Sequence, residues 1–316
     1  MTTSHERTGH EDLSVGQLTV TPQTFSADPP VALRWRKTAA WLRGAPIIPL
    51  FIMAVLVFTG VFADFLAPHN AEVGNLRLRY RPPVWQERGS WDFVLGTDHM
   101  GRDILSRLIF GSRISLVVGI MGVLVAGSIG TLLGIVSGFY GRWVDQVIMR
   151  LTDSWLALPA VSLAILLAAL SSPSKWNIVI ILGAVYWTRY ARVIRSEVLS
   201  LKERDYVRLA VVAGCSRAKI MWTHILPNVA NTAIVLATLN FGVVIIAGAT
   251  LSFLGVGVAP PEPEWGLMLS EGKSGLMAGY WWLSVLPGLC IMFVVLAANL
   301  LGDWFRVWSD PQLRQL

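Results

Sequence analysis

The chain has 316 residues, of which 54% are hydrophobic and only 15% are charged. A soluble domain carries about 25% charged residues, so this composition and the mean hydropathy of +0.56 favour an integral membrane protein. The net charge of +6 does not indicate a nucleic-acid-binding protein, because the basic residues are scattered through loops between apolar runs and are expected to face anionic lipid.

Cysteine and histidine give no sign of a metal centre or a disulfide. Cys215 and Cys290 lie far apart and lack metal-ligand spacing, so we expect both to be small packing residues. The histidines form no ligand pair at helical spacing, and we therefore expect this chain to hold neither a metal nor a cofactor. They are His5, His10, His69, His99 and His224.

The N-terminal region divides into a polar tail and a first apolar run. Residues 1–45 are polar and lack an apolar period, which predicts a largely disordered cytosolic tail. The run from Ile47 to Leu66 is long enough to span a bilayer. A signal peptide is the alternative, but the run lies far from the N-terminus and lacks a small-x-small cleavage site. We expect residues 46–66 to form the first transmembrane helix.

Residues 67–113 are hydrophilic and form a predicted extracytoplasmic loop. Its second half leads into the sequence LGTDHMGRDILSRLIFGSRISL, in which Thr97 or Asp98 can cap a short helix. That helix would have an apolar and a polar face, which predicts an amphipathic helix on the membrane surface before the second span. The apolar residues are Ile104, Leu105, Leu108 and Ile109, and the polar ones are Arg102, Asp103, Ser106 and Arg107.

Residues 114–305 hold further apolar runs and form the predicted transmembrane core. In the first run Gly130, Gly134 and Gly138 recur every four residues, a ridge that lets two helix backbones approach closely. The ridge would serve a dimer or internal packing, and we favour internal packing. Asp153 is expected to be exposed at the membrane boundary rather than functional. The runs cover about 114–139, 143–170, 176–190, 227–254 and 281–305.

A charged segment, residues 189–228, separates the runs that end near 190 and begin near 227. Its basic side chains require water. A helix-permissive stretch begins at Asp205 and stops at Gly214, after which Ser216 can cap a second short helix that closes at Pro227. This pattern predicts a helix, a glycine turn and a helix. The simpler alternative is an ordinary basic loop that follows the positive-inside rule.

Two stretches carry a family resemblance. The spacing from Leu209-Ala210 through Gly214 to Leu226-Pro227 resembles the cytoplasmic coupling loop, or EAA loop, of bacterial ABC importer permeases. Arg208 stands where that family usually has an acidic residue, and Leu209 replaces an alanine. The block from Gly96 to Asp103 resembles the entrance to the second helix in the C-type permease subunits of dipeptide and oligopeptide importers. Further matches are Pro260 to Gly266, Asn299 to Asp303, and Asp310-Pro311.

This resemblance implies an all-α integral membrane protein with six transmembrane helices of the type I ABC importer permease kind. It implies a second permease subunit, two ATP-binding subunits that hold ATP and Mg on the cytosolic side, and an extracytoplasmic substrate-binding protein. The implied substrates are dipeptides or oligopeptides, with nickel or another small solute as the alternative. A secondary transporter is disfavoured, because the two halves of the sequence are not similar.

The resemblance also implies two groups of site residues. The residues expected to couple to an ATP-binding subunit are Asp205, Arg208, Leu209, Ala210, Gly214, Ser216, Ile220, His224, Leu226 and Pro227. The entrance motif comprises Gly96, Thr97, Asp98, Gly101, Arg102 and Asp103.

The sequence contains none of the phosphate-loop, serine-hydrolase or zinc-protease motifs. Gly272-Lys273-Ser274 invites a phosphate-loop interpretation, but Leu267 stands where that motif needs a glycine. Neither G-x-S-x-G nor H-E-x-x-H occurs, so we expect a transport subunit without catalytic residues. The basic charged segment and six spans put both termini, including the tail 306–316, on the cytoplasmic side of a bacterial plasma membrane.

Overall fold

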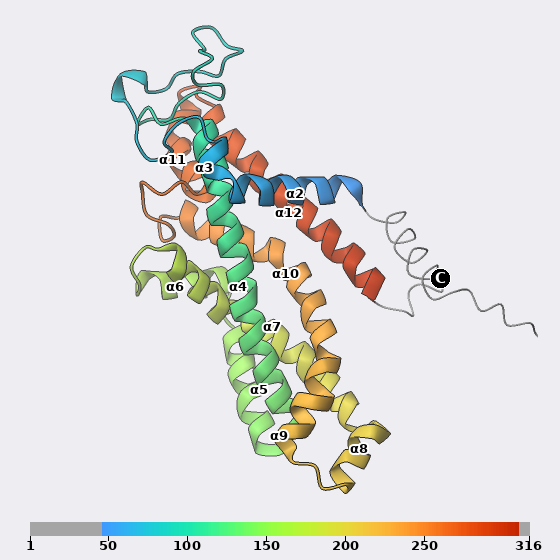
Figure 1. Cartoon of the computed structure of the whole chain (residues 1–316). Coiled ribbons are helices and arrows are strands. Elements are labelled where there is room, and N and C mark those ends of the chain that lie inside the picture. Colours follow the sequence, from blue (N-terminus) through green and yellow to red (C-terminus); the bar gives the residue numbers. More distant parts are fainter. Residues whose placement is uncertain (1–45, 310–316) are drawn as a thin grey trace, which may run out of the picture. The chain divides into compact units, whose positions relative to one another are not determined.

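The computed structural model describes residues 46–309 (Figure 1). The regular elements in this range are helices, and the remaining ladder pairing consists of two isolated bridges in the loop before α4. The predicted all-α class is therefore confirmed. The predicted tail of residues 1–45 and the Asp310-Pro311 ending lie outside the described residues.

The helices follow one another along the chain with mostly short connections. In order they are α2 (Ile47–Val61), α3 (Ala63–Leu66), the 3-10 turn η1 (Leu76–Leu78), α4 (Ile104–Tyr140), α5 (Arg142–Leu156), α6 (Ala160–Ala169), α7 (Lys175–Lys202), α8 (Asp205–Val212), α9 (Arg217–Ile220), the π-helix η2 (Met221–Ile225), α10 (Leu226–Phe253), α11 (Trp265–Met277) and α12 (Trp282–Ser309).

Three helices within residues 46–309 are long and apolar enough to cross a membrane alone: α4, the continuous helix Arg217–Phe253 and α12. The bent pair α5 and α6 makes up to a fourth span. α2 has 15 residues, about 22 Å of helix against a hydrocarbon core of about 30 Å. The number of six spans therefore stays a prediction.

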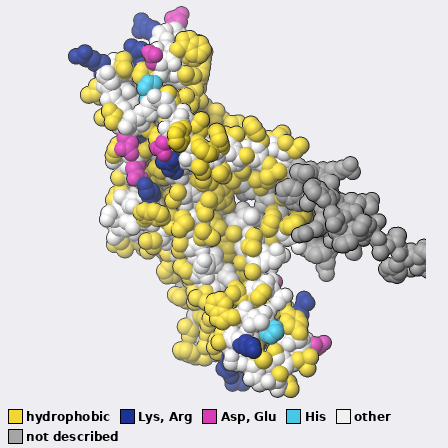
Figure 2. All heavy atoms as spheres, viewed as in Figure 1, with side chains coloured by type: hydrophobic (Ala, Val, Ile, Leu, Met, Phe, Trp, Pro, Cys, Tyr) yellow, Lys and Arg dark blue, Asp and Glu magenta, His cyan; other side chains and the backbone are white. Residues whose placement is uncertain are grey.

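Figure 2 shows hydrophobic side chains over most of the visible face between two ends where charged side chains gather.

The glycine ridge of α4 packs against α7. A Cβ on Gly130 would lie 2.2 Å from the Trp187 carbonyl oxygen, and one on Gly134 would lie 2.8 Å from that of Ala191. Real Cβ atoms do not approach so closely, so these glycines let the two backbones touch. The expectation of internal packing is confirmed, and the ridge is already covered within the chain.

The run expected near residues 143–170 is not one straight helix. It divides into α5 and α6, which are bent by 90° relative to each other. The break is at Pro159, which lies immediately before α6. Proline lacks a backbone N–H and disfavours helical conformation in the residue before it, which favours a break at this point.

The predicted amphipathic surface helix is absent as a separate element from the described residues. Its sequence forms the first turns of α4, which runs without a break for 37 residues. The cap is Asp103, which accepts a hydrogen bond from the Ser106 N–H at 2.9 Å. The polar side chains are not spread on a membrane surface, because Arg102 is 4% exposed and Arg107 is fully buried. Buried carboxylates hold these arginines, as described below.

Candidate functional site

The charged segment begins as a helix rather than as a loop. α7 continues through the arginines to Lys202, so residues 189–202 of the predicted coupling loop are helical instead. Arg192 pairs with Asp153 at 2.7 Å and Arg195 pairs with Asp145 at 2.5 Å, both on α5. A loop was expected here because of the basic side chains. The two aspartates neutralise Arg192 and Arg195, so the helix can continue. Asp153 is exposed, and its place at the membrane boundary stays a prediction.

The helix, the glycine turn and the start of the second helix follow as predicted, and we call residues 205–220 the α8–α9 hairpin. The second helix does not close at Pro227, because α9 continues through η2 and α10 to Phe253. Gly214 has a φ of +74°, a left-handed conformation that disfavours residues with a Cβ. The N–H of Cys215 donates to the Ala210 carbonyl oxygen at 3.1 Å across the turn. Ser216 caps α9 by accepting from the Lys219 N–H at 3.3 Å.

One side of the α8–α9 hairpin is anchored in a hydrophobic core. Val207 is 2% exposed and Ile220 is 1% exposed, and both belong to a cluster with Ile194 and Val198 of α7. Close-packed side chains transmit a displacement of one element to its neighbours. Ile220 therefore joins the hairpin to the bundle and does not offer its side chain to a partner surface.

The other side of the hairpin is exposed and partly apolar. Val212 is 84% exposed, Leu209 is 66% exposed and Tyr206 is 40% exposed. A group of exposed apolar side chains among charged ones is typical of a protein contact surface. Sequence reasoning missed Tyr206 and Val212, although an aromatic and an apolar residue within the predicted helical stretch of a charged segment were a usable signal. Of the other expected residues, Asp205, Arg208, Gly214, Ser216 and Pro227 are exposed, and Ala210, His224 and Leu226 are half-buried.

Four charged side chains form an ion-pair cluster at the other end of α4. Asp98 accepts from Arg102 at 2.6 Å and from Arg107 at 2.7 Å. Glu271 of α11 accepts from Arg102 at 3.0 Å, and its 2.9 Å contact with Arg107 Nη2 is a charge contact without hydrogen-bond alignment. Burial alone would raise the pKa of Asp98, but the two guanidiniums outweigh it and hold this pKa below its usual value.

The predicted entrance motif folds the loop that carries Asp98. Gly96 and Gly101 have φ of +82° and +75°, and a Cβ on Gly101 would lie 1.9 Å from the Asn75 carbonyl oxygen. Thr97 is fully buried, and its hydroxyl donates to the Leu78 carbonyl oxygen. The motif therefore builds an ordered outer lobe, residues 67–103, which the ion-pair cluster ties to α11. Sequence reasoning missed Glu271, because no local pattern links it to this loop.

Two members of the ion-pair cluster and the neighbouring His99 form the one group within residues 46–309 that approaches metal-ligand geometry. Asp98, His99 and Glu271 offer ligand atoms within 4.8 Å of one another. Both carboxylates are already neutralised by Arg102 and Arg107, so a cation would have to displace these ion pairs. The arrangement suits a structural cluster better than a metal site.

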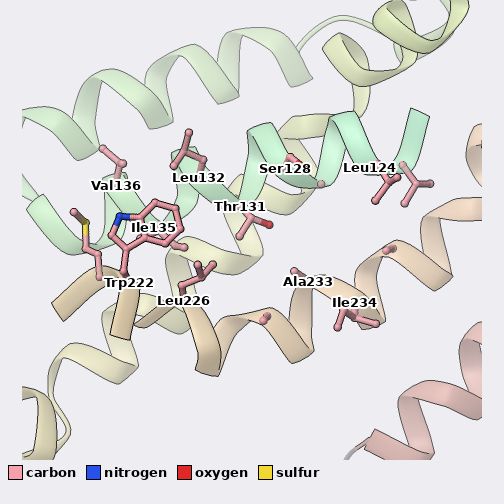
Figure 3. Close-up of a pocket in the computed structure, with 15 residues that line it drawn as sticks. Leu124, Ser128, Thr131, Leu132, Ile135, Val136, Trp222, Leu226, Ala233 and Ile234 are labelled. Carbon is pink, nitrogen blue, oxygen red and sulfur yellow. The ribbon is translucent and has the colours of Figure 1, made fainter. Parts of the chain in front are cut away.

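An apolar groove of about 550 Å³ lies between α4 and the helix that starts at α9 (Figure 3). Leu132 and Ile135 of α4 line one side, and Trp222, Leu226 and Ile234 line the other. Trp222 is 63% exposed at the end nearest the α8–α9 hairpin. The lining offers few polar groups, so it does not have the character of a site for a zwitterionic or strongly polar ligand.

Comparison with known proteins bears on this geometry. Residues 130–315 match the family model described as binding-protein-dependent transport system inner membrane component, which is more than half of the chain. The chain belongs to this family. The matched region of this inner membrane component includes α5 to α12, and therefore the α8–α9 hairpin and Glu271.

Curated relatives resemble this inner membrane component over nearly its full length. It is 40% identical over 295 residues to the dipeptide transport system permease protein DppC of Haemophilus influenzae, covering 93% of this chain and 99% of the relative. It is 41% identical over 269 residues to the DppC of Escherichia coli, covering 85% and 89%. It is 41% identical over 265 residues to the di/tripeptide transport system permease protein DppC of Pseudomonas aeruginosa, covering 84% and 87%.

Proposed function

We propose that this chain is a permease subunit of an ATP-driven importer of dipeptides and short oligopeptides. The observation that carries the proposal is the 40% identity to a dipeptide permease across 99% of that protein. Several apolar helices long enough to span a membrane agree with a multi-pass subunit that forms part of a transport path.

Energy is proposed to come from partner subunits. In the complex, a second permease completes the path, two ATP-binding subunits hold ATP and Mg in the cytosol, and a soluble protein delivers substrate from outside. Gly272-Lys273-Ser274 lies inside α11 instead of in a strand-to-helix loop, and Gly272 packs against Leu283. This geometry cannot cradle phosphates as a phosphate loop does, which agrees with hydrolysis on other chains.

The α8–α9 hairpin is proposed as the contact with an ATP-binding subunit. Its exposed side, with Leu209 and Val212, offers apolar area to a partner. Its buried side, with Val207 and Ile220, packs on α7. A movement imposed on the hairpin would therefore displace α7 and, through the glycine ridge, α4.

Orientation follows from this assignment. The hairpin end is proposed to lie in the cytosol and the outer lobe on the opposite side, with both termini cytosolic in a bacterial inner membrane. α9, the π-helix η2 and α10 form one continuous helix that is long enough to cross the membrane. The hairpin therefore lies next to the membrane.

Reconstitution tests the function. The chain, its partner permease, its ATP-binding subunits and its binding protein are placed in liposomes, and ATP hydrolysis and uptake are measured with dipeptides, longer peptides and Ni²⁺. We expect dipeptides to stimulate hydrolysis and to enter the vesicles. Stimulation and uptake with Ni²⁺ but with no peptide would contradict the peptide assignment while leaving an importer.

A further inference from the structure

Arg189 is a cation in the middle of a helix that is otherwise apolar at this level. It is exposed, whereas its neighbours Trp187, Thr188 and Tyr190 are at most 5% exposed. α7 runs from Lys175 to Lys202, so Arg189 stands near the midpoint of its length. Its side chain leaves the bundle at a point where the helix itself is closely packed.

The level of Arg189 in the membrane follows from the packing of α7 on α4. Tyr190 lies against Gly127 and Trp187 lies against Gly130. These glycines are near the centre of the uncharged stretch of α4 that lies between Arg113 and Arg142. Such a stretch is about 42 Å long, more than the hydrocarbon core of about 30 Å. Arg189 therefore lies close to the bilayer midplane.

Unlike the arginines that follow it on α7, Arg189 has no carboxylate partner among residues 46–309. Arg192 and Arg195 are paired with aspartates of α5. Arg189 instead makes a long 3.4 Å contact to Asn240 Oδ1, and its guanidinium lies 5.3 Å from the centre of the Tyr186 ring. Both contacts are to neutral groups, so its charge is not balanced within this part of the chain.

The neighbours of Arg189 hold it in place without using up its donors. Asn240 is 6% exposed, and its amide nitrogen donates to the Leu236 carbonyl oxygen at 2.8 Å, which leaves the amide oxygen facing Arg189. A guanidinium has five N–H donors in a planar fork. One long contact therefore leaves most of them available to a ligand.

An exposed, unbalanced cation at the midplane is costly in lipid and faces either a water-filled path or another protein. We propose that Arg189 lies on the translocation path and binds the C-terminal carboxylate of the peptide as it crosses, with Tyr186 and Asn240 as positioning residues. This assignment rests on the proposed function. The terminal carboxylate is the one anion common to peptides of every sequence, and a guanidinium binds carboxylates through two parallel hydrogen bonds.

The test compares two peptides in the reconstituted complex: alanyl-alanine, with a free carboxylate, and alanyl-alanine amide, without one. The ratio of their uptake rates is measured for the wild type and for Arg189→Gln, Arg189→Lys and Arg192→Gln. The binding protein is the same throughout, so its own preference cancels when each variant's ratio is divided by that of the wild type. Recovery of the complex and basal ATP hydrolysis are measured as controls.

We expect Arg189→Gln to lower uptake of the free acid about tenfold, the scale of a lost hydrogen bond to a charged group, and to leave amide uptake unchanged. Arg189→Lys keeps the charge and retains most of the free-acid uptake. If amide uptake by the wild type is too slow to measure, the comparison of free-acid uptake between Arg189→Gln and Arg189→Lys still tests whether the positive charge is needed. Arg192→Gln, one turn away and already paired with Asp153, leaves the ratio unchanged.

Two results would overturn the assignment. Equal loss for both peptides, or loss of the complex itself, would mean that Arg189 pairs with a carboxylate of the second permease. An unchanged ratio and free-acid rate in Arg189→Gln would mean that it does not contact the peptide. If the wild-type complex imports no peptide but does import another solute, the proposed function fails first and this assignment falls with it.

Discussion

At the scale of single residues, the outer lobe depends on buried charges that neutralise one another. Arg107 is fully buried and would be unstable there without Asp98 and Glu271. Removing one member of a buried ion pair typically costs about 3–5 kcal/mol, because the charge left behind is uncompensated. The cluster is therefore a point at which one substitution should release the outer lobe from α11.

We expect Arg107→Met to increase hydrogen exchange throughout residues 67–103, because it leaves two carboxylates with one guanidinium. The protein should still insert, since the change lies at the end of α4. Lys175→Met is the matched control: its pair with Glu262 is at the surface and contributes about 0–1 kcal/mol. Equal exchange in the wild type and Arg107→Met would show that the cluster does not hold the lobe.

Acid should weaken the same contact. The pKa of Asp98 lies below the usual 3.8, because Arg107 and Arg102 outweigh the effect of burial. A depressed pKa adds stability above the unfolded value, and this is lost as the pH falls through the folded value. Exchange of residues 67–103, corrected for its intrinsic pH dependence, should therefore stay constant from about pH 7 to pH 5 and rise below about pH 4. A rise centred near pH 6 would assign the effect to a histidine instead.

Local patterns in the sequence predicted local geometry, and pairings distant in the chain were out of reach. Gly214 stands in the turn that the surrounding residues predict, and it has a positive φ. The partner of Asp98 on α11 could not be predicted, because nothing near Glu271 marks it as facing α4. For that reason Arg102 and Arg107 were assigned to the polar face of a surface helix.

At the scale of elements, α7 was predicted to end too early because its ion pairs with a helix distant in the sequence could not be predicted. Charge was interpreted as the start of a loop at residue 189, but Asp145 and Asp153 on α5 pair with two of the arginines and the helix continues. Pro159 was the opposite case, a strong local signal for the bend between α5 and α6 that a search for apolar runs passes over. The α8–α9 hairpin was predictable because its cap and its turn are local.

The hairpin prediction concerns Gly214→Val. A β-branched residue at a φ of +74° would destabilise the turn by about 1–2 kcal/mol. Gly214 is exposed and has no atom within 4 Å of a Cβ position, so the substitution strains the turn without disturbing the core. We expect normal amounts in the membrane, with weaker recovery of the ATP-binding subunits or hydrolysis uncoupled from uptake.

Gly255→Val separates coupling from backbone strain in general. Gly255 has a φ of +82° and likewise has no atom within 4 Å of a Cβ position, but it follows α10 at the end opposite the hairpin. The same strain should therefore leave ATP-binding subunits attached. Wild-type uptake and stimulated hydrolysis in Gly214→Val, at matched membrane levels, would remove the coupling role from the hairpin.

At the scale of the whole chain, ion pairing bears on the one difficulty for the proposed orientation. The loop assigned to the outside is more basic than the positive-inside rule favours. Arg102 and Arg107 are neutralised within the cluster, and Arg113 pairs with Asp64 at 2.7 Å. Three of the basic residues on that side are thus held by carboxylates, which weakens the objection from charge counting.

Cysteine labelling tests this orientation directly. Ser274 of α11 and Ala218 of α9 are both exposed, on elements proposed to lie outside and inside the membrane. In a Cys215→Ala, Cys290→Ala background and without the ATP-binding subunits, an impermeant maleimide should label Ser274→Cys in intact cells. Ala218→Cys should react only after permeabilisation. If both react in intact cells, the hairpin is not cytosolic, and it cannot contact an ATP-binding subunit in the way proposed.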